Sequence, residues 1–111
     1  MAHYQDVRLD ATFQALADRT RRAMVVQLGR CGVQTAGELA APHAMSLQAA
    51  LKHIRVLMQA NLVTREKVGR TVRCQLDTSH LLQAATWIED QERFWSERLD
   101  ALGDFVERDE L

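Results

Sequence analysis

The chain has 111 residues, of which 47% are hydrophobic and 26% charged, a composition typical of one compact globular domain. Two cysteines are too few for a disulfide framework. The sequence also shows neither a hydrophobic run of membrane-spanning length nor an apolar N-terminal signal segment. These features exclude secreted disulfide-rich scaffolds and membrane-spanning proteins, and predict a single cytoplasmic domain over residues 1–111.

The formal net charge of −1 conceals an uneven distribution. Residues 1–88 contain eleven Lys and Arg against six Asp and Glu, a net charge of +5. Residues 89–111 contain three Arg against nine acids, a net charge of −6. A basic body followed by an acidic segment is one of the asymmetries that indicate a polyanionic partner, although solvated helix surfaces produce it too.

Helical spacing predicts two helices in the first third of the chain. Leu9, Phe13 and Leu16 recur at the spacing of a first short helix. Asp18 has the side chain of an N-cap and precedes a second helix, predicted over residues 19–30 and ending at Gly32. The residues expected on its buried face are Ala23, Val26 and either Val25 or Leu28.

Capping residues predict the next two helices. Thr35-x-x-Glu38 matches a capping box and begins a short third helix, which Pro42 prevents from continuing. Ser46 is the expected N-cap of a fourth helix, and Asn61 its left-handed stop. The stripe expected to be buried along the fourth helix consists of Leu47, Ala50, Ile54 and Leu57.

The period then changes to that of strands. In residues 62–77 apolar and polar side chains alternate, and Gly69-Arg70 suits a tight turn between two strands. Asp77 can cap a long last helix with a four-three apolar repeat. The resulting fold is mainly α with a small β-hairpin. Five helices plus a two-stranded wing, in this order, are the plan of a winged helix-turn-helix.

The fourth helix carries the first functional signal. Gln48, Lys52 and Arg55 fall on one face, with Leu51 beside them. A helix with such a face can enter the major groove of DNA, where an amide pairs with adenine and a lysine reaches guanine. Leu51 would then lie against a thymine methyl group. Ser46 suits a phosphate at the helix start, and Arg55 suits the DNA backbone. His53 is expected either to contact that backbone or to pack at the edge of the helix.

The hairpin carries the second signal. Four cations surround its turn against one acid, Glu66, and they can follow phosphates or enter the minor groove. They are Arg65, Lys67, Arg70 and Arg73. Each signal alone also fits a solvated helix face or a charged sheet edge that prevents aggregation. Together, in this order, they favour double-stranded DNA as the partner. The rival interpretation is a protein-interaction module that docks through Leu51 and the last helix.

Several segments closely resemble the ArsR-type winged-helix transcriptional repressors. They are ALADRTRR (Ala15–Arg22), GELA (Gly37–Ala40), MSLQAALKHIRVL (Met45–Leu57), ANLV (Ala60–Val63) and GRTVRCQLD (Gly69–Asp77). The resemblance covers nearly the whole chain and implies a homodimer that binds a pseudo-palindromic operator and represses transcription. The sequence departs from the family at Arg19, where proline is usual, and at Leu51, where serine is common. These departures imply an altered operator preference.

A dimer also has support in the residues themselves, because a long four-three apolar helix usually needs a partner surface. Trp87, Phe94 and Trp95 are large enough to anchor such an interface, although aromatic side chains can equally cover the domain's own core. The resemblance implies that the first and last helices form the interface. It adds the candidates Leu9, Phe13, Leu99 and Leu102.

No metal, cofactor or catalytic site is predicted. Thr35 and Gly37 stand where one family site has its Cys-x-Cys pair, so this branch lacks that motif. Asp77 and His80 resemble only half of a second site type. Cys74 shares the strand phase of apolar residues and is expected to be buried, whereas Cys31 is a possible redox thiol. No phosphate loop or nucleophile elbow indicates an enzyme, and whether an effector exists stays open.

Overall fold

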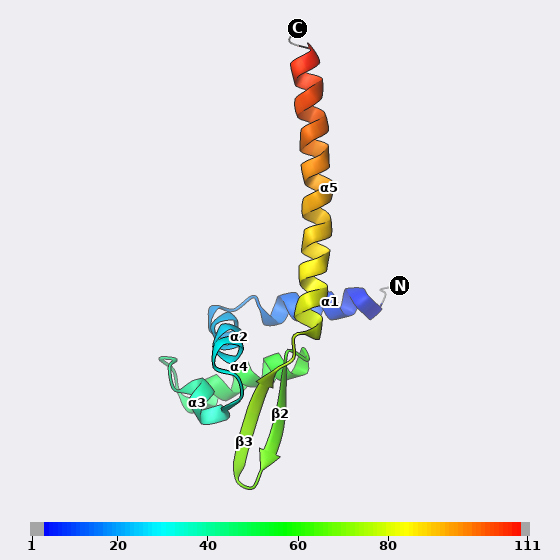
Figure 1. Cartoon of the computed structure of the whole chain (residues 1–111). Helices are drawn as coiled ribbons and strands as arrows, with labels where there is room; N and C mark the ends of the chain where they lie inside the picture. The colour runs from blue at the N-terminus through cyan, green and yellow to red at the C-terminus, as the bar shows by residue number, and fades with distance from the viewer. Residues whose placement is uncertain (1–3, 110–111) are drawn as a thin grey trace.

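The computed structural model describes residues 4–109 (Figure 1). Its elements in chain order are α1 (Tyr4–Ala15), α2 (Arg19–Cys31), β1 (Gln34–Thr35), α3 (Ala36–Ala40), α4 (Leu47–Gln59), β2 (Val63–Val68), β3 (Thr71–Leu76) and α5 (Ser79–Asp109). The five helices and the hairpin therefore follow the predicted order. The winged-helix fold class is confirmed.

Three helices begin where their capping residues predict. The Asp18 carboxylate accepts from the N–H of Arg21 at 3.1 Å, which starts α2. Thr35 and Glu38 form both hydrogen bonds of the capping box at the start of α3. The Ser46 hydroxyl accepts from the N–H of Ala49 at 3.1 Å and starts α4. These side chains satisfy amides that have no partner within their own helices.

The core lies among α2, α3, α4 and the sheet. Met24, Leu28, Leu39, Ile54 and Leu57 are buried there. The face predicted for α2 is wrong in part, because Ala23 is exposed and Val26 is 48% exposed. The buried face of α2 instead contains Met24 and Leu28. The apolar spacing within α2 alone does not determine which face is turned to the core.

The stripe predicted for α4 holds except at its first residue. Ala50, Ile54 and Leu57 are buried, whereas Leu47 is 54% exposed. Leu47 is the first residue of α4, directly after the cap, and it lies before the turn at which the helix meets the core. At the other end Asn61 has the predicted left-handed conformation, with φ of 59°.

The sheet has three antiparallel strands in the order β1-β3-β2. Val68 pairs with Thr71, so Gly69 and Arg70 form the predicted two-residue turn, and Gly69 has a φ of 63°. The two-stranded wing is thus extended by β1, in which Gln34 pairs with Cys74. A two-residue strand shows no alternation, so the sequence did not predict it. Strand β1 attaches the start of α3 to β3 of the wing.

Helix α5 has 31 residues and leaves the body of the molecule (Figure 1). Near its start it packs against α1, where Arg8 Nη1 lies 2.7 Å from His80 Nε2 and the rings of Phe13 and Trp87 meet edge to face at 5.9 Å. Among the α5 side chains that the structure describes, only Ala84 is buried. Within residues 4–109, no helix combines the length and apolar character needed to cross a membrane.

Replacement of Asp18 tests the first cap. Asp18→Ala should lower the free energy of unfolding by about 1 kcal/mol at neutral pH, because the Arg21 N–H loses its acceptor. Asp18→Asn is the matched control, since its side-chain oxygen can still accept. Urea unfolding followed by circular dichroism measures both variants. An Asp18→Ala variant as stable as the parent would contradict this role of the cap.

The charge of the cap adds a pH dependence. The hydrogen bond from the Arg21 N–H holds the pKa of the Asp18 carboxyl below its usual value. A lowered folded-state pKa adds stability that is present above the unfolded-state pKa of about 3.9 and is lost as pH falls through the folded value. The advantage of the parent over Asp18→Asn should therefore shrink as pH falls below about 3.9.

Candidate nucleic-acid interface

One face of α4 presents a row of polar side chains to solvent. Gln48, Lys52, Arg55 and Gln59 follow one another at intervals of four, three and four residues, and all four are exposed. The buried line of Ala50, Ile54 and Leu57 lies on the other side of the helix. The structure therefore brings three of the predicted contact residues together. It adds Gln59, whose position in the same helical row was the signal available in the sequence.

Leu51 differs from its predicted placement, whereas His53 takes one of its two predicted placements, packed at the edge of the helix. Leu51 is partly buried and packs against the core, which gives a structural reason for a leucine at this position. His53 is also partly buried, with its Nδ1 3.3 Å from Nη1 of Arg21 and 3.8 Å from Oδ2 of Asp18. Neither side chain belongs to the exposed row. The core contact of Leu51 and the Arg21 partner of His53 come from segments outside α4, and no pattern within α4 reveals them.

The loop before α4 is held by side chains that sequence reasoning missed. Gln27 Nε2 donates to Gln34 Oε1 at 2.8 Å and to the carbonyl oxygen of Glu38 at 3.2 Å. His43 Nε2 lies 3.1 Å from Gln27 Oε1. These contacts join α2, β1, the end of α3 and the loop to α4. They fix the turn of the helix-turn-helix, and nothing in the local sequence around Gln27 or His43 indicated them.

The wing exposes all four predicted cations, but they are not equivalent. Arg73 pairs across the strands with Glu66. It also lies near Glu38, whose carboxyl pKa is lowered mainly by the hydrogen bond from the Thr35 N–H and to a smaller extent by Arg73. The charge of Arg73 is thus partly offset by the Glu38 carboxylate. Most of the positive charge available to a partner comes from Arg65, Lys67 and Arg70.

The exposed row of α4 and the wing belong to the same end of the molecule. α4 leads through Ala60–Leu62 directly into β2, and the Asp77 N–H donates to the Leu62 carbonyl oxygen at 2.9 Å, which holds the base of the wing against the end of α4. The wing points away from the distal end of α5 (Figure 1). A helix-turn-helix with a polar second helix and a basic hairpin defines the winged-helix class of DNA-binding proteins.

Comparison with known proteins identifies the family. No family model matches the chain. It is 37% identical over 98 residues to the HTH-type transcriptional regulator Rv2034 of Mycobacterium tuberculosis, an alignment covering 88% of each protein. Over 80 residues it is 28% identical to the transcriptional repressor SdpR of Bacillus subtilis, with 72% of this chain and 88% of SdpR covered. The crystal structure of the ArsR family transcriptional regulator RHA00566 matches with a TM-score of 0.77 and 36% identity, over 86% of this chain and 97% of that one.

The chain therefore belongs to the ArsR family of transcriptional regulators. The predicted class, a DNA-binding transcriptional repressor, is confirmed by these relatives. They are named as regulators of transcription rather than as enzymes. The individual DNA-contacting residues and the dimer interface stay predictions at this point.

The titratable residues outside this face do not form a metal centre in the part of the chain that the structure describes. Within residues 4–109 no three His, Cys, Asp or Glu side chains lie close enough together to hold an ion. Asp77 Oδ1 instead accepts from the N–H and hydroxyl of Ser79, and His80 contacts Arg8. Cys31 is exposed, whereas Cys74 is fully buried and its burial raises the pKa of the thiol.

The two thiols should react at very different rates. In the native protein at neutral pH, Cys31 should react with an aromatic disulfide reagent, and Cys74 only after unfolding, because burial both blocks access and disfavours its thiolate. Stopped-flow absorbance measures the two phases, and Cys31→Ser should remove the native phase alone. Two equal native rates would contradict the burial of Cys74. Redox control through Cys31 stays a prediction, and operator affinity after peroxide treatment tests it.

Proposed function

We propose that this protein acts as a homodimer that binds a pseudo-palindromic operator, with α4 of each protomer in a major groove, and represses transcription from the adjacent promoter. The observation that carries this proposal is the exposed row on α4 next to the basic wing. A winged helix that offers donors and acceptors on one helix, and cations on the neighbouring hairpin, matches both the base edges and the phosphates of a duplex.

The residues of the exposed row have different expected roles. Gln48 lies in the first turn of α4, where an amide can make a bidentate contact with adenine. Lys52, one turn later, reaches guanine acceptors or a phosphate. Arg55 and Gln59 continue the row towards the end of the helix and suit the backbone. Leu51 and His53 are not among the proposed DNA contacts. Leu51 packs against the core, and the ring of His53 contacts Arg21.

Phosphate contacts would come from both ends of this surface. At the start of α4 the Ser46 hydroxyl caps the helix, and its O–H together with the helix N-terminus suits a phosphate. On the wing Arg65, Lys67 and Arg70 are exposed and can follow the backbone or enter the minor groove. Such contacts position the protein and carry little sequence information, so we assign base recognition to α4 and affinity to the wing.

The apolar row on α5 supports the dimer. Trp95 is 65% and Leu99 67% exposed, and Phe94 and Leu102 are exposed with them. The row continues to Phe105 and Val106, which the sequence analysis did not name as interface residues. A contiguous apolar surface of this kind on a helix that leaves its own body is typical of an association surface. In the proposed homodimer, a second copy of the chain covers this apolar row.

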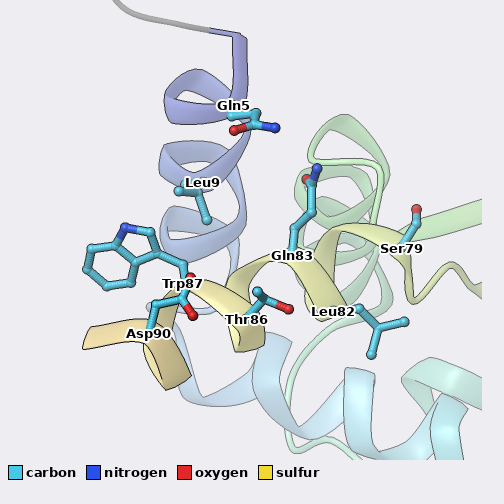
Figure 2. A pocket seen from close by; sticks show the side chains of 8 residues that line it. All are labelled: Gln5, Leu9, Ser79, Leu82, Gln83, Thr86, Trp87 and Asp90. Atoms are coloured by element: carbon cyan, nitrogen blue, oxygen red, sulfur yellow. The ribbon is translucent and has the colours of Figure 1, made fainter. Parts of the chain in front are cut away.

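The junction of α1 and α5 extends that surface. A hollow of about 380 Å³ lies at this junction. Figure 2 shows its lining, which comes from Gln5 and Leu9 of α1 and from side chains of α5 that include Leu82, Gln83 and Trp87. Phe13 lies against Trp87 and remains partly accessible. The candidates Leu9, Phe13 and Trp87 therefore form one continuous surface with the first turns of α5. We propose that a second protomer covers this surface.

Two substitutions separate base recognition from phosphate binding. Gln48→Ala should cost on the order of 1–3 kcal/mol on the selected operator and relax the preference at the contacted base pair. Arg70→Ala should weaken binding to all sequences alike and reduce the salt slope by about one. Arg93→Ala is the matched control, because it removes the same charge from α5, far from the wing. Fluorescence anisotropy against an operator selected from a random pool measures all three. Equal binding of the parent to scrambled DNA would contradict the proposed function.

A charge introduced into the apolar row should dissociate the dimer. Trp95→Glu and Leu99→Glu place a carboxylate in the proposed interface, where its desolvation opposes association, so the dimer dissociation constant should rise at least about 100-fold. Arg93→Glu adds an acid on the opposite, polar face of α5 and should leave association nearly unchanged. Sedimentation equilibrium measures the three constants. If the parent protein sediments as a monomer at all concentrations, the proposed homodimer is wrong.

A further inference from the structure

The side chain of Arg21 connects three elements. Arg21 belongs to the first turn of α2, yet its guanidinium turns back to α1, where Nε donates to the carbonyl oxygen of Ala15 at 2.6 Å and Nη2 to that of Gln14 at 3.0 Å. Its Nη1 lies 3.3 Å from Nδ1 of His53 in the middle of α4. One partly buried side chain therefore contacts both the end of α1 and the helix proposed to enter the groove.

The end of α1 needs such a donor. The last carbonyl groups of a helix have no partner within it and carry the negative end of its dipole. Helix α1 has no basic residue in its own last turn, and Arg21 and Arg22 of α2 supply donors instead. Arg22 Nη1 donates to the carbonyl oxygen of Leu16 at 2.8 Å. Arg22 is exposed and donates to the residue directly after α1, whereas Arg21 also reaches α4.

His53 completes the connection from the side of α4. Because an arginine only donates, Nδ1 of His53 is the acceptor in this contact with Nη1 of Arg21. Asp18 faces the same nitrogen at 3.8 Å while its carboxylate caps α2 through the Arg21 N–H. Arg21 and Asp18 therefore lie together at the start of α2, and His53 attaches α4 to this pair.

Helix α1 is also attached to α5. Arg8 Nη1 lies 2.7 Å from His80 Nε2, and Phe13 packs on Trp87. Helix α1 thus lies between the helix of the proposed dimer surface and the helix of the proposed DNA surface. In a dimer bound to two half-sites, the orientation of each α4 relative to the dimer surface determines the distance between the two groove helices. A change of only about 3.4 Å in that distance corresponds to one base pair.

We propose that Arg21 and His53 are positioning residues that set the angle of α4 relative to α1, and so determine which half-site spacing the dimer accepts. This inference rests on the proposed function. It assigns His53 to orientation of the recognition helix rather than to contact with DNA. The chemical recognition stays with the exposed row on α4. Arg21 and His53 select among operators with identical half-sites and different spacers.

The test uses the full-length protein and a set of duplexes built from the operator that the parent selects. The two half-sites are kept and the spacer is shortened or lengthened by one and two base pairs. The parent should lose about tenfold or more in affinity when one base pair is added or removed. For Arg21→Ala and His53→Ala the same ratio should fall to within about threefold, because a looser α4 accommodates neighbouring spacings. Arg22→Ala, which removes an equal charge from the end of α1, should retain the parent's ratio.

A conservative variant separates orientation from general damage. In His53→Asn the amide oxygen can take the place of Nδ1 as an acceptor for Arg21, so spacer discrimination should be restored. Arg21→Lys keeps the charge but its single ammonium cannot match the planar fork that contacts α1 and His53 together, so discrimination should fall. Thermal unfolding of each variant shows whether it is folded. If Arg21→Ala does not fold, Arg21→Lys and His53→Ala carry the test.

The outcomes distinguish this inference from the proposed function. Unchanged spacer discrimination in His53→Ala and Arg21→Lys overturns the inference while operator binding stands. An equal loss of affinity at every spacer in His53→Ala also overturns it, since that result indicates a direct backbone contact by His53. A parent that selects no operator overturns the proposed function and, with it, the inference. Reduced discrimination with retained affinity for the best spacer, rescued by His53→Asn, supports the inference.

Discussion

The burial of one face of α4 determines which of its side chains a partner can reach. Ile54 and Leu57 are buried against α2 and the sheet, and desolvation of such side chains stabilises each by roughly 1.5–3 kcal/mol. A rotation of α4 that exposed them would also bury Lys52 without a partner, at a larger cost. The exposed row is therefore held outward by the core rather than by any interaction of its own, and recognition chemistry can vary there without loss of the fold.

Local chemistry accounts for most of what the sequence predicted correctly. Asp18, Ser46 and the Thr35–Glu38 pair began helices because their bonds span only three residues, and Asn61 and Gly69 supplied positive φ where turns require it. Predictions failed where a distant segment decides. Strand β1 exists because β3 lies beside it, and Leu51 is partly buried because it packs against the core. No window within α4 contains that information.

The motif ALADRTRR illustrates how a recognisable segment can have a role that spacing does not show. Its aspartate was predicted as a cap, and the structure confirms it. Two of its arginines, Arg21 and Arg22, act through the turn between α1 and α2, which brings their guanidinium groups onto carbonyl oxygens six and seven residues earlier. A helical projection of α2 places Arg21 on its surface. Only the path of α1 shows that this surface position faces the end of another helix.

The direction of α5 separates the acidic residues of the chain from the basic wing. Residues 89–111 carry a net charge of −6, and most of their acids lie on the part of α5 that leaves the body on the side opposite the wing (Figure 1). Exposed charges separated by more than a Debye length of about 8 Å are largely screened at physiological ionic strength. The acidic segment thus contributes little repulsion to a polyanion at the wing, while Arg65, Lys67 and Arg70 attract it at contact distance. An acidic helix folded back along α4 would compete with DNA for the same cations, so the outward direction of α5 keeps association and DNA binding on separate surfaces.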